Sequence, residues 1–217
     1  MKRQWINRKA NPVLLLFFNG WGMDANVLSH LDPAGNDVLM FYDYTEPELP
    51  ALDDISDYPE IHLAAWSFGV YAAASSGLKL PLLSATAFNG TLFPINADEG
   101  IDPALFTATL ENWNEAGQKK FYRRISGKAA FCSPLRTTEE QRLELAALGQ
   151  RANAAAAPEF RFTRAFAAEN DRIFPLAAQR YCWEKREIPL TVLPGTHYLF
   201  DRYQFWKELY QYENKTR

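Results

Sequence analysis

Nearly uninterrupted apolar runs, separated by turn-forming residues, fill the first ninety residues of this chain. They occur at residues 13–18, 38–41, 61–65 and 82–88. Strands that are apolar on almost every residue, instead of on alternate ones, are typical of a parallel sheet covered on both faces. A helix-like stretch at 68–78 directly follows one of these runs. The pattern predicts an α/β fold built from right-handed βαβ units.

The last third of the chain adds shorter elements of the same kind. We expect strands at 161–167 and 189–193, each more polar at its start than the earlier ones. Residues 203–212 carry apolar side chains at helical spacing and predict an amphipathic closing helix.

The middle of the chain has no strand pattern. Residues 103–116 and 138–155 are predicted to be helices, and both lie before the last two strands. We therefore expect one domain over residues 1–217, with residues 100–158 forming a small helical lid inserted within it. Its mainly parallel sheet would carry helices on both faces.

Ser67 occupies a position typical of a catalytic nucleophile. It is the centre of Ala-Trp-Ser-Phe-Gly, between a predicted strand and a predicted helix. This is the nucleophile-elbow arrangement, in which a strained turn presents the serine Oγ above the sheet. Residues two before and two after must be small, and Ala65, where glycine is usual, and Gly69 meet this need. The alternative is an ordinary helix N-cap serine.

Three histidines are candidates for the general base. His62 lies five residues before Ser67 in the same strand, roughly 16 Å away, which is too far to take its proton. His30 is expected at the surface. His197 follows strand 189–193 and lies at the same end of the sheet as Ser67, where catalytic groups of α/β sheets gather. We predict His197 as the base.

A carboxylate that orients the base is expected after strand 161–167. Asp171 lies there and is predicted to accept a hydrogen bond from His197 Nδ1. The chain order Ser67, Asp171, His197 is that of the α/β-hydrolases. Glu169, closer to the strand, is the alternative acid.

Two backbone N–H groups are candidates for an oxyanion hole. Phe68 follows the nucleophile, and the loop Asn-Gly-Trp-Gly follows the first apolar run. We assign the second donor to Trp21, since the flanking glycines allow close approach of substrate. The alternative is that Gly20 and Gly22 only make a tight turn.

Residues 119–128 carry five positive charges and no negative ones. They form either a solvated helix face or a docking patch for an acidic partner. The candidate docking residues are Lys119, Lys120, Arg123 and Arg124. Aromatic residues of the predicted lid would line an acyl channel or form the lid's own core; they are Phe106, Trp113, Phe121, Tyr122 and Phe131.

Composition narrows the partners and the compartment. The formal net charge is −3, which argues against a broad nucleic-acid-binding face. Cys132 and Cys182 form no CxxC pair and are expected to be free thiols of a reducing cytosol. The six-residue apolar run at 13–18 is too short to span a membrane or to serve as a signal core. We expect a cytoplasmic monomer with neither nucleic acid nor membrane as a partner.

Four stretches, at residues 18–23, 64–70, 88–95 and 120–124, resemble the short pimeloyl-acyl-carrier-protein methyl ester esterases of biotin synthesis, the BioG type. The likeness covers nearly the whole chain. The Asn-Gly-Trp-Gly loop and an Asn-Gly-Thr stretch are its more specific parts.

The resemblance implies a serine carboxylesterase that needs no metal or other cofactor. Its substrate would be a methyl ester at the far end of a pimeloyl chain tethered to acyl carrier protein, an acidic partner. By motif position Ser67, His197 and Asp171 would be catalytic, and Trp21 and Phe68 would form the oxyanion hole. Arg123 and Arg124 match a basic lid pair that contacts the carrier.

Two other functions stay open from the sequence. One is a general small-ester hydrolase or thioesterase that uses no carrier. The other is a catalytically silent hydrolase fold used for binding.

Overall fold

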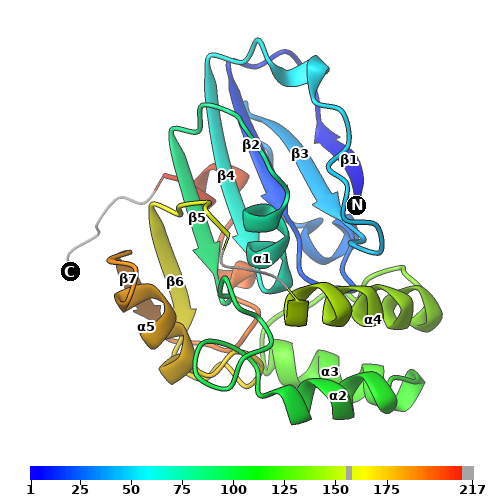
Figure 1. The fold of residues 1–217 in the computed structure, drawn as a ribbon. Helices are drawn as coiled ribbons and strands as arrows, with labels where there is room; N and C mark the ends of the chain where they lie inside the picture. Colours follow the sequence, from blue (N-terminus) through cyan, green and yellow to red (C-terminus); the bar gives the residue numbers. More distant parts are fainter. Residues whose placement is uncertain (155–157, 212–217) are drawn as a thin grey trace.

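The computed structural model describes residues 1–154 and 158–211, and a seven-stranded sheet forms its centre (Figure 1). The strand order is β1-β3-β2-β4-β5-β6-β7. β1 is antiparallel to β3, and the other neighbouring strands are parallel. This confirms the predicted, mainly parallel α/β fold. The strands are β1 Lys2–Asn7, β2 Val13–Phe18, β3 Asp37–Tyr42, β4 Glu60–Trp66, β5 Ser84–Phe88, β6 Arg164–Ala168 and β7 Leu190–Leu193.

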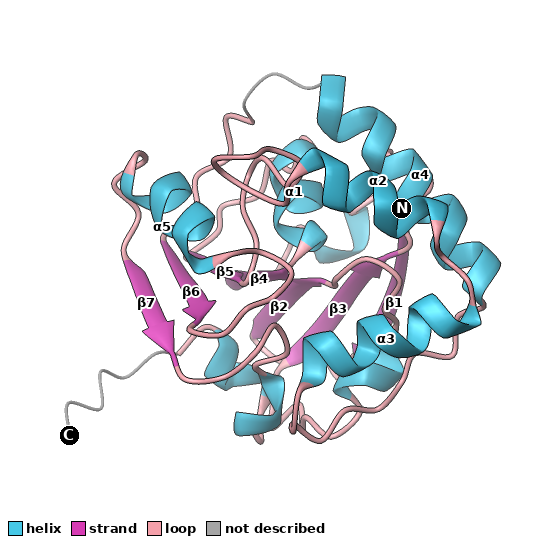
Figure 2. Ribbon diagram, turned by 90° about the horizontal axis from the view of Figure 1, so that it is seen from below, coloured by secondary structure: helices cyan, strands magenta, loops and turns pink. Residues whose placement is uncertain are grey.

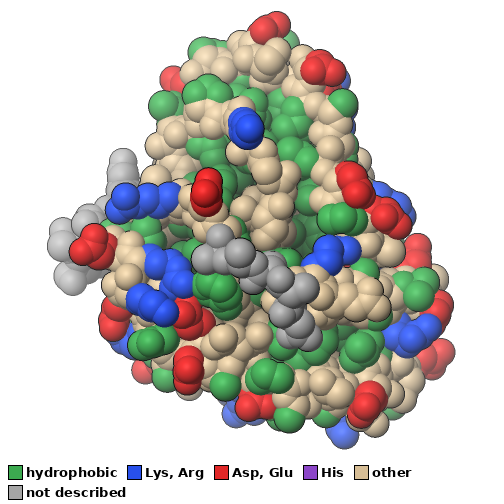
Figure 3. Space-filling view, viewed as in Figure 1, with side chains coloured by type: hydrophobic (Ala, Val, Ile, Leu, Met, Phe, Trp, Pro, Cys, Tyr) green, Lys and Arg blue, Asp and Glu red, His purple; other side chains and the backbone are tan. Residues whose placement is uncertain are grey.

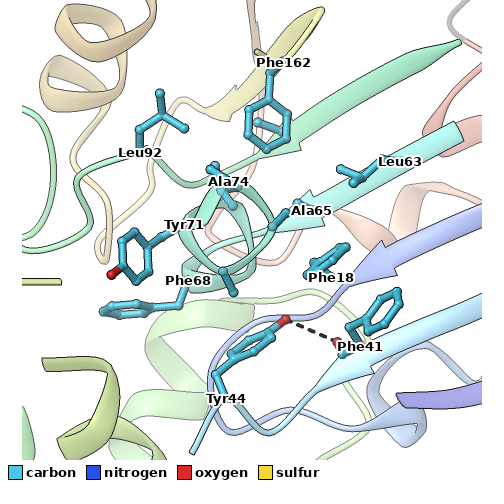
Figure 4. Packing of buried hydrophobic residues seen from close by; sticks show 14 of the residues in the cluster. Phe18, Phe41, Tyr44, Leu63, Ala65, Phe68, Tyr71, Ala74, Leu92 and Phe162 are labelled. Carbon is cyan, nitrogen blue, oxygen red and sulfur yellow. Dashed lines mark hydrogen bonds between the residues drawn. The ribbon is translucent and has the colours of Figure 1, made fainter. Parts of the chain in front are cut away.

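Both faces of the sheet are buried, which explains why its strands are apolar at successive positions. Leu16 and Phe18 of β2 pack in the cluster that contains α1 (Phe68–Ser75), whereas Leu15 and Phe17 pack in the cluster on the opposite face. Figure 4 shows part of the first cluster, with Phe18 near α1. Helix α5 (Leu176–Glu184) contributes to this same cluster. Short 3₁₀ turns cover the second face.

The prediction of a closing helix at 203–212 is wrong. The chain there forms a 3₁₀ turn, Trp206–Leu209, after an extended stretch. Asp32 causes the interruption, because its N–H donates to the Gln204 carbonyl and its carbonyl accepts from the Trp206 N–H, at 2.9 and 3.0 Å. These bonds fix an extended bridge where a helix would have to begin. Residue 212 lies outside the described residues.

Three helices lie between β5 and β6, in the region predicted as a lid. They are α2 (Pro103–Glu111), α3 (Glu115–Ser126) and α4 (Thr138–Ala154). The helix expected at 103–116 is present but ends at Glu111, because the Asn114 side chain accepts from the N–H groups of Ala116 and Gly117 and starts a second helix. Figures 1 and 2 show these helices gathered at the carboxyl ends of the strands.

The surface shows no broad region of one charge on the face drawn in Figure 3, where acidic and basic side chains are interspersed. Within the described ranges, none of the helices combines the length and the apolar character needed to cross a membrane.

Candidate active site

Ser67 sits at a sharp turn between β4, which ends at Trp66, and α1, which begins at Phe68. Its backbone has φ 58° and ψ −128°, a region that non-glycine residues rarely adopt. The Ser67 N–H donates to the Phe88 carbonyl at 3.0 Å. The side chain makes no capping hydrogen bond to α1, so the hydroxyl does not serve as an ordinary N-cap.

Two glycines allow this turn to pack tightly. A Cβ atom on Gly69 would lie 2.3 Å from the Phe18 carbonyl oxygen, and one on Gly90 would lie 2.4 Å from the Ser67 carbonyl oxygen. The elbow therefore rests directly on the backbone at the ends of β2 and β5. Ala65, the departure from the usual glycine, is fully buried, and its methyl group is accommodated in the core beside α1 (Figure 4).

The structure brings Ser67, His197 and Asp171 together. His197 Nε2 lies 3.0 Å from Ser67 Oγ, and His197 Nδ1 lies 2.8 Å from Asp171 Oδ2. All three residues are buried. An ionised carboxylate accepts only, so Nδ1 carries the hydrogen in this pair and Nε2 is left as the acceptor for the serine hydroxyl.

The Asp171 carboxylate accepts several hydrogen bonds besides that of His197. Asp171 Oδ1 accepts from the N–H groups of Ile173 and Phe174 at 2.7 and 3.0 Å. Its Oδ2 also accepts from Gln179 Nε2 at 3.2 Å. Glu169 has an exposed side chain at the end of β6. Of the two carboxylates, the structure places Asp171 against His197.

Asn89 fixes the loop that carries His197, and sequence reasoning gave it no role. Its Nδ2 donates to the His197 carbonyl at 2.8 Å, and its Oδ1 accepts from the Ala168 N–H at 2.6 Å. The Trp66 indole donates to the same His197 carbonyl at 3.0 Å. The signals in the sequence were the Asn-Gly pair after a predicted strand and its place in the Asn-Gly-Thr stretch of the resemblance, and Asn89 indeed has a positive φ of 44°.

The His197 loop is also attached to the end of α3. The Thr196 hydroxyl and the Tyr198 N–H both donate to the Ile125 carbonyl, at 2.9 and 2.8 Å. The loop is therefore fixed from two sides, by Asn89 beneath it and by α3 beside it.

The other two histidines lie elsewhere, as expected. His62 Nδ1 lies 2.8 Å from Ser84 Oγ, and its ring stacks on Tyr210. Burial lowers the pKa of His62. The positive charge of Arg164 lowers this pKa further, whereas the negative charge of Glu60 raises it by less than the two together. His30 is exposed, and its Nε2 lies 3.0 Å from the Phe200 carbonyl oxygen.

The predicted oxyanion donors, Trp21 and Phe68, line the same pocket as Ser67. Across residues 1–154 and 158–211, the backbone N–H of neither residue donates to a protein acceptor. Both residues are nearly fully buried. Two buried N–H groups without acceptors, beside a serine hydroxyl, are what binding of a negatively charged oxygen requires.

The aromatic residues predicted for this region divide between the Ser67 pocket and packing among themselves and with neighbouring elements. Phe106 and Phe121 line the pocket with Ser67. Trp113 instead packs on Trp21 with ring centroids 4.5 Å apart, and Phe131 packs on Tyr198. The pocket wall is mainly apolar, and Arg124 and Arg172 are its charged members.

Four basic side chains of α3 are exposed: Lys119, Lys120, Arg123 and Arg124. In the described part of the chain, none of them forms an ion pair. Arg124 also lines the Ser67 pocket. The helix thus presents free positive charge beside the pocket.

The sheet order, the serine at the β4–α1 elbow and the histidine after β7 define an α/β-hydrolase. A hydrolase of Pseudomonas aeruginosa shares this fold, with a TM-score of 0.61 and 10% identity over 90% of this chain and 86% of that one. A family model described as pimeloyl-ACP methyl esterase BioG matches residues 1–209. The chain belongs to that family and is an ester hydrolase.

Two individual proteins are similar to this chain over most of its length. The crystal structure of BioG from Haemophilus influenzae has a TM-score of 0.88 and 34% identity, covering 97% of this chain and 100% of that one. A malonyl-[acyl-carrier protein] O-methyltransferase of Bacteroides fragilis is 38% identical over 85% of this chain. The chain spans only 39% of that longer protein.

Proposed function

We propose that this protein hydrolyses the methyl ester of pimeloyl-acyl carrier protein with Ser67, His197 and Asp171 as its catalytic residues. The observation that carries the assignment is the hydrogen-bonded series from Ser67 Oγ through His197 to Asp171, at 3.0 and 2.8 Å. The family match supplies the substrate class.

The first half of the reaction forms an acyl-enzyme. Ser67 Oγ attacks the ester carbon while His197 Nε2 takes the hydroxyl proton, and Asp171 stabilises the resulting imidazolium. The tetrahedral oxygen carries negative charge, which the N–H groups of Trp21 and Phe68 stabilise. Collapse breaks the bond to the methoxy group, and His197 returns the proton to release methanol.

The second half frees the acid. His197 takes a proton from water, whose oxygen attacks the acyl-enzyme carbonyl carbon. Collapse of the second tetrahedral intermediate breaks the bond between the acyl carbon and Ser67 Oγ, and His197 returns its proton to that oxygen. The product is a carboxylic acid at the end of the pimeloyl chain, which ionises in water. No step in this sequence calls on a group outside the chain, the ester and water.

Acyl carrier protein, as the acidic partner, would dock on α3. Support comes from the exposed, unpaired charges of Lys119, Lys120, Arg123 and Arg124 beside the pocket. The Bacteroides fragilis relative is named for methyl transfer to malonyl-acyl carrier protein, a reaction that produces a carrier-bound methyl ester. A lid role for residues 100–158, a cytoplasmic location and a monomeric state remain predictions.

Ser67→Ala tests the chemistry. We expect this variant to fold normally, to lose methanol release from carrier-bound pimeloyl methyl ester, and to escape labelling by a fluorophosphonate probe that labels the parent protein. Near-parental turnover by the variant would remove Ser67 from the mechanism. Failure of the probe to label the parent would instead favour a silent binding protein.

Charge reversal tests the carrier. The double variant Arg123→Glu/Arg124→Glu should lower kcat/KM on the carrier-bound ester far more than on a short soluble methyl ester, because only the former carries an acidic protein. Lys79→Glu/Arg180→Glu changes the net charge equally at two exposed residues outside the lid and serves as the control. Equal losses on both esters would favour a general esterase that uses no carrier.

A further inference from the structure

Helix α4 is bonded directly to the loop that presents the Trp21 N–H. The Trp21 indole donates to the Gln141 carbonyl at 2.7 Å. In the opposite direction, Gln141 Nε2 donates to the Gly22 carbonyl at 2.9 Å. Gln141 is fully buried, so neither bond competes with water.

Glu144, one turn further along α4, holds the same loop. Its Oε2 accepts from the Gly22 N–H at 3.0 Å, and its Oε1 accepts from the Tyr44 N–H at 3.0 Å. Arg136 forms an ion pair with this fully buried carboxylate. Burial raises the pKa of Glu144, while the Arg136 charge and the Tyr44 N–H act against that rise.

These contacts restrict the direction of the Trp21 N–H. The Gly20 carbonyl and the Trp21 N–H belong to one planar peptide unit and point in opposite directions. The Gly20 carbonyl accepts from the Met23 N–H at 3.2 Å, and Glu144 and Gln141 hold both polar backbone groups of Gly22. The N–H groups of Gly20, Gly22 and Met23 all have acceptors, whereas that of Trp21 has none among residues 1–154 and 158–211 and can meet a substrate oxygen.

Gln141 also connects the loop to α3. Its Nε2 lies 2.7 Å from the Tyr122 hydroxyl, and its Oε1 accepts from Gln118 Nε2 at 2.8 Å. Burial raises the pKa of Tyr122 to about 12, so its hydroxyl stays protonated at neutral pH. One buried amide therefore joins α3, α4 and the loop of Trp21.

We infer that Gln141 and Glu144 are positioning residues for the Trp21 oxyanion donor, which makes α4 a fixed part of the catalytic machinery instead of a movable cover. This rests on the proposed role of Trp21. Removing a whole oxyanion donor costs about 10²–10³ in kcat, so misdirecting one should cost about ten- to a hundredfold.

Gln141→Glu is the main test. It keeps the size of the side chain and the acceptor for Gln118, but it places an oxygen against the Gly22 carbonyl. We expect kcat to fall about ten- to a hundredfold with KM changed much less. Affinity for a trifluoromethyl ketone analogue of the ester, which Ser67 converts into an oxyanion, should weaken by the same factor.

The controls separate positioning from general damage. Arg142→Gln changes the next residue of α4, whose side chain is 43% exposed and paired with Glu139, and should leave kcat unchanged. In a Ser67→Ala background, Gln141→Glu should leave the affinity for the intact carrier-bound ester unchanged, because the ground state develops no oxyanion charge.

Trp21→Phe removes the indole N–H that donates to the Gln141 carbonyl and keeps the backbone N–H of residue 21. It replaces Gln141→Glu as the test if that variant does not fold. Parental kcat and inhibitor affinity in the variant that folds would overturn the inference, as would an equal kcat loss in Arg142→Gln. Those outcomes would leave the Ser67 chemistry standing, whereas turnover by Ser67→Ala would remove the proposed function itself.

Discussion

Replacing Asn89 with aspartate exchanges one NH₂ group for an oxygen at the point where the His197 loop rests on the sheet. The acceptor toward the Ala168 N–H is kept, but the new oxygen faces the His197 carbonyl, at a site where the amide nitrogen is 2.8 Å away. Asn89 is fully buried, so water cannot separate the two oxygens.

The expected loss of stability follows from that contact. A buried charge left without its partner costs about 3–5 kcal/mol. For a chain of this size each kcal/mol lowers Tm by about 2–4 °C, so Asn89→Asp should melt about 6–20 °C below the parent. Asn89→Ala leaves the Ala168 N–H without its acceptor and removes the donor to the Thr196 carbonyl, while the Trp66 indole still donates to the His197 carbonyl; it should cost about 1–3 kcal/mol. Asn89→Asp, although isosteric, is therefore expected to lower the free energy of unfolding more than Asn89→Ala.

Activity should fall with the displacement of His197. A shift of about 1 Å in a catalytic group costs about a hundredfold in rate, so kcat on a pimeloyl methyl ester, measured well below Tm, should drop by about that factor in Asn89→Asp. Lowering the pH should restore part of the lost stability, because a protonated carboxyl can donate to the His197 carbonyl. A variant with parental Tm and kcat, or one milder than Asn89→Ala, would refute the reasoning.

Three further outcomes are expected. Asp171→Asn should lower kcat about 10³–10⁴-fold with little change in KM, because the amide no longer selects the His197 tautomer; a loss below tenfold in steady-state assays would contradict the assigned acid. Burial raises the pKa of the Cys182 thiol to about 11, so iodoacetamide at pH 8 should modify the exposed Cys132 alone, and intact mass should show one adduct before denaturation and two after it. Burial raises the pKa of Glu99, but the hydrogen bond from Lys185 and the ion pair with Arg186 outweigh this and leave that pKa lowered. The resulting stabilisation is present above the normal titration range of glutamate and disappears as the pH falls, so the Tm gap between the parent and Glu99→Gln should be widest near neutrality and close in acid. A gap independent of pH would show that the charge contributes nothing.

The buried strands could be predicted from sequence because two-sided burial leaves a local signature. Leu14 and Leu15 point to opposite faces and both are apolar, so an uninterrupted apolar run indicates a strand that is buried on both faces. β1 escaped prediction because it is an edge strand in which charged residues such as Lys2 and Arg3 are tolerated. The closing helix was predicted wrongly because its interruption comes from Asp32, a residue far away in the chain.

Some residues of the candidate site could likewise be predicted from the sequence, and others could not. Ser67 and His197 were found because the ends of parallel strands meet at one edge, so their position could be worked out from the order of elements. Asn89, Gln141 and Gln179 were missed because a buried amide looks like any loop or helix polar residue until its distant partners are known. The partners of these amides come from 5 to 119 residues away.

The Ile125 carbonyl, which accepts from both neighbours of His197, has a consequence for how an ester reaches Ser67. If the carboxyl end of α3 swung outward, it would pull the imidazole from the serine and leave the hydroxyl without a proton acceptor. An entrance opened in that way would admit substrate to an inert enzyme. Leu105 of α2 lines the pocket and is 62% exposed, so an approach past α2 would leave both bonds to the Ile125 carbonyl intact.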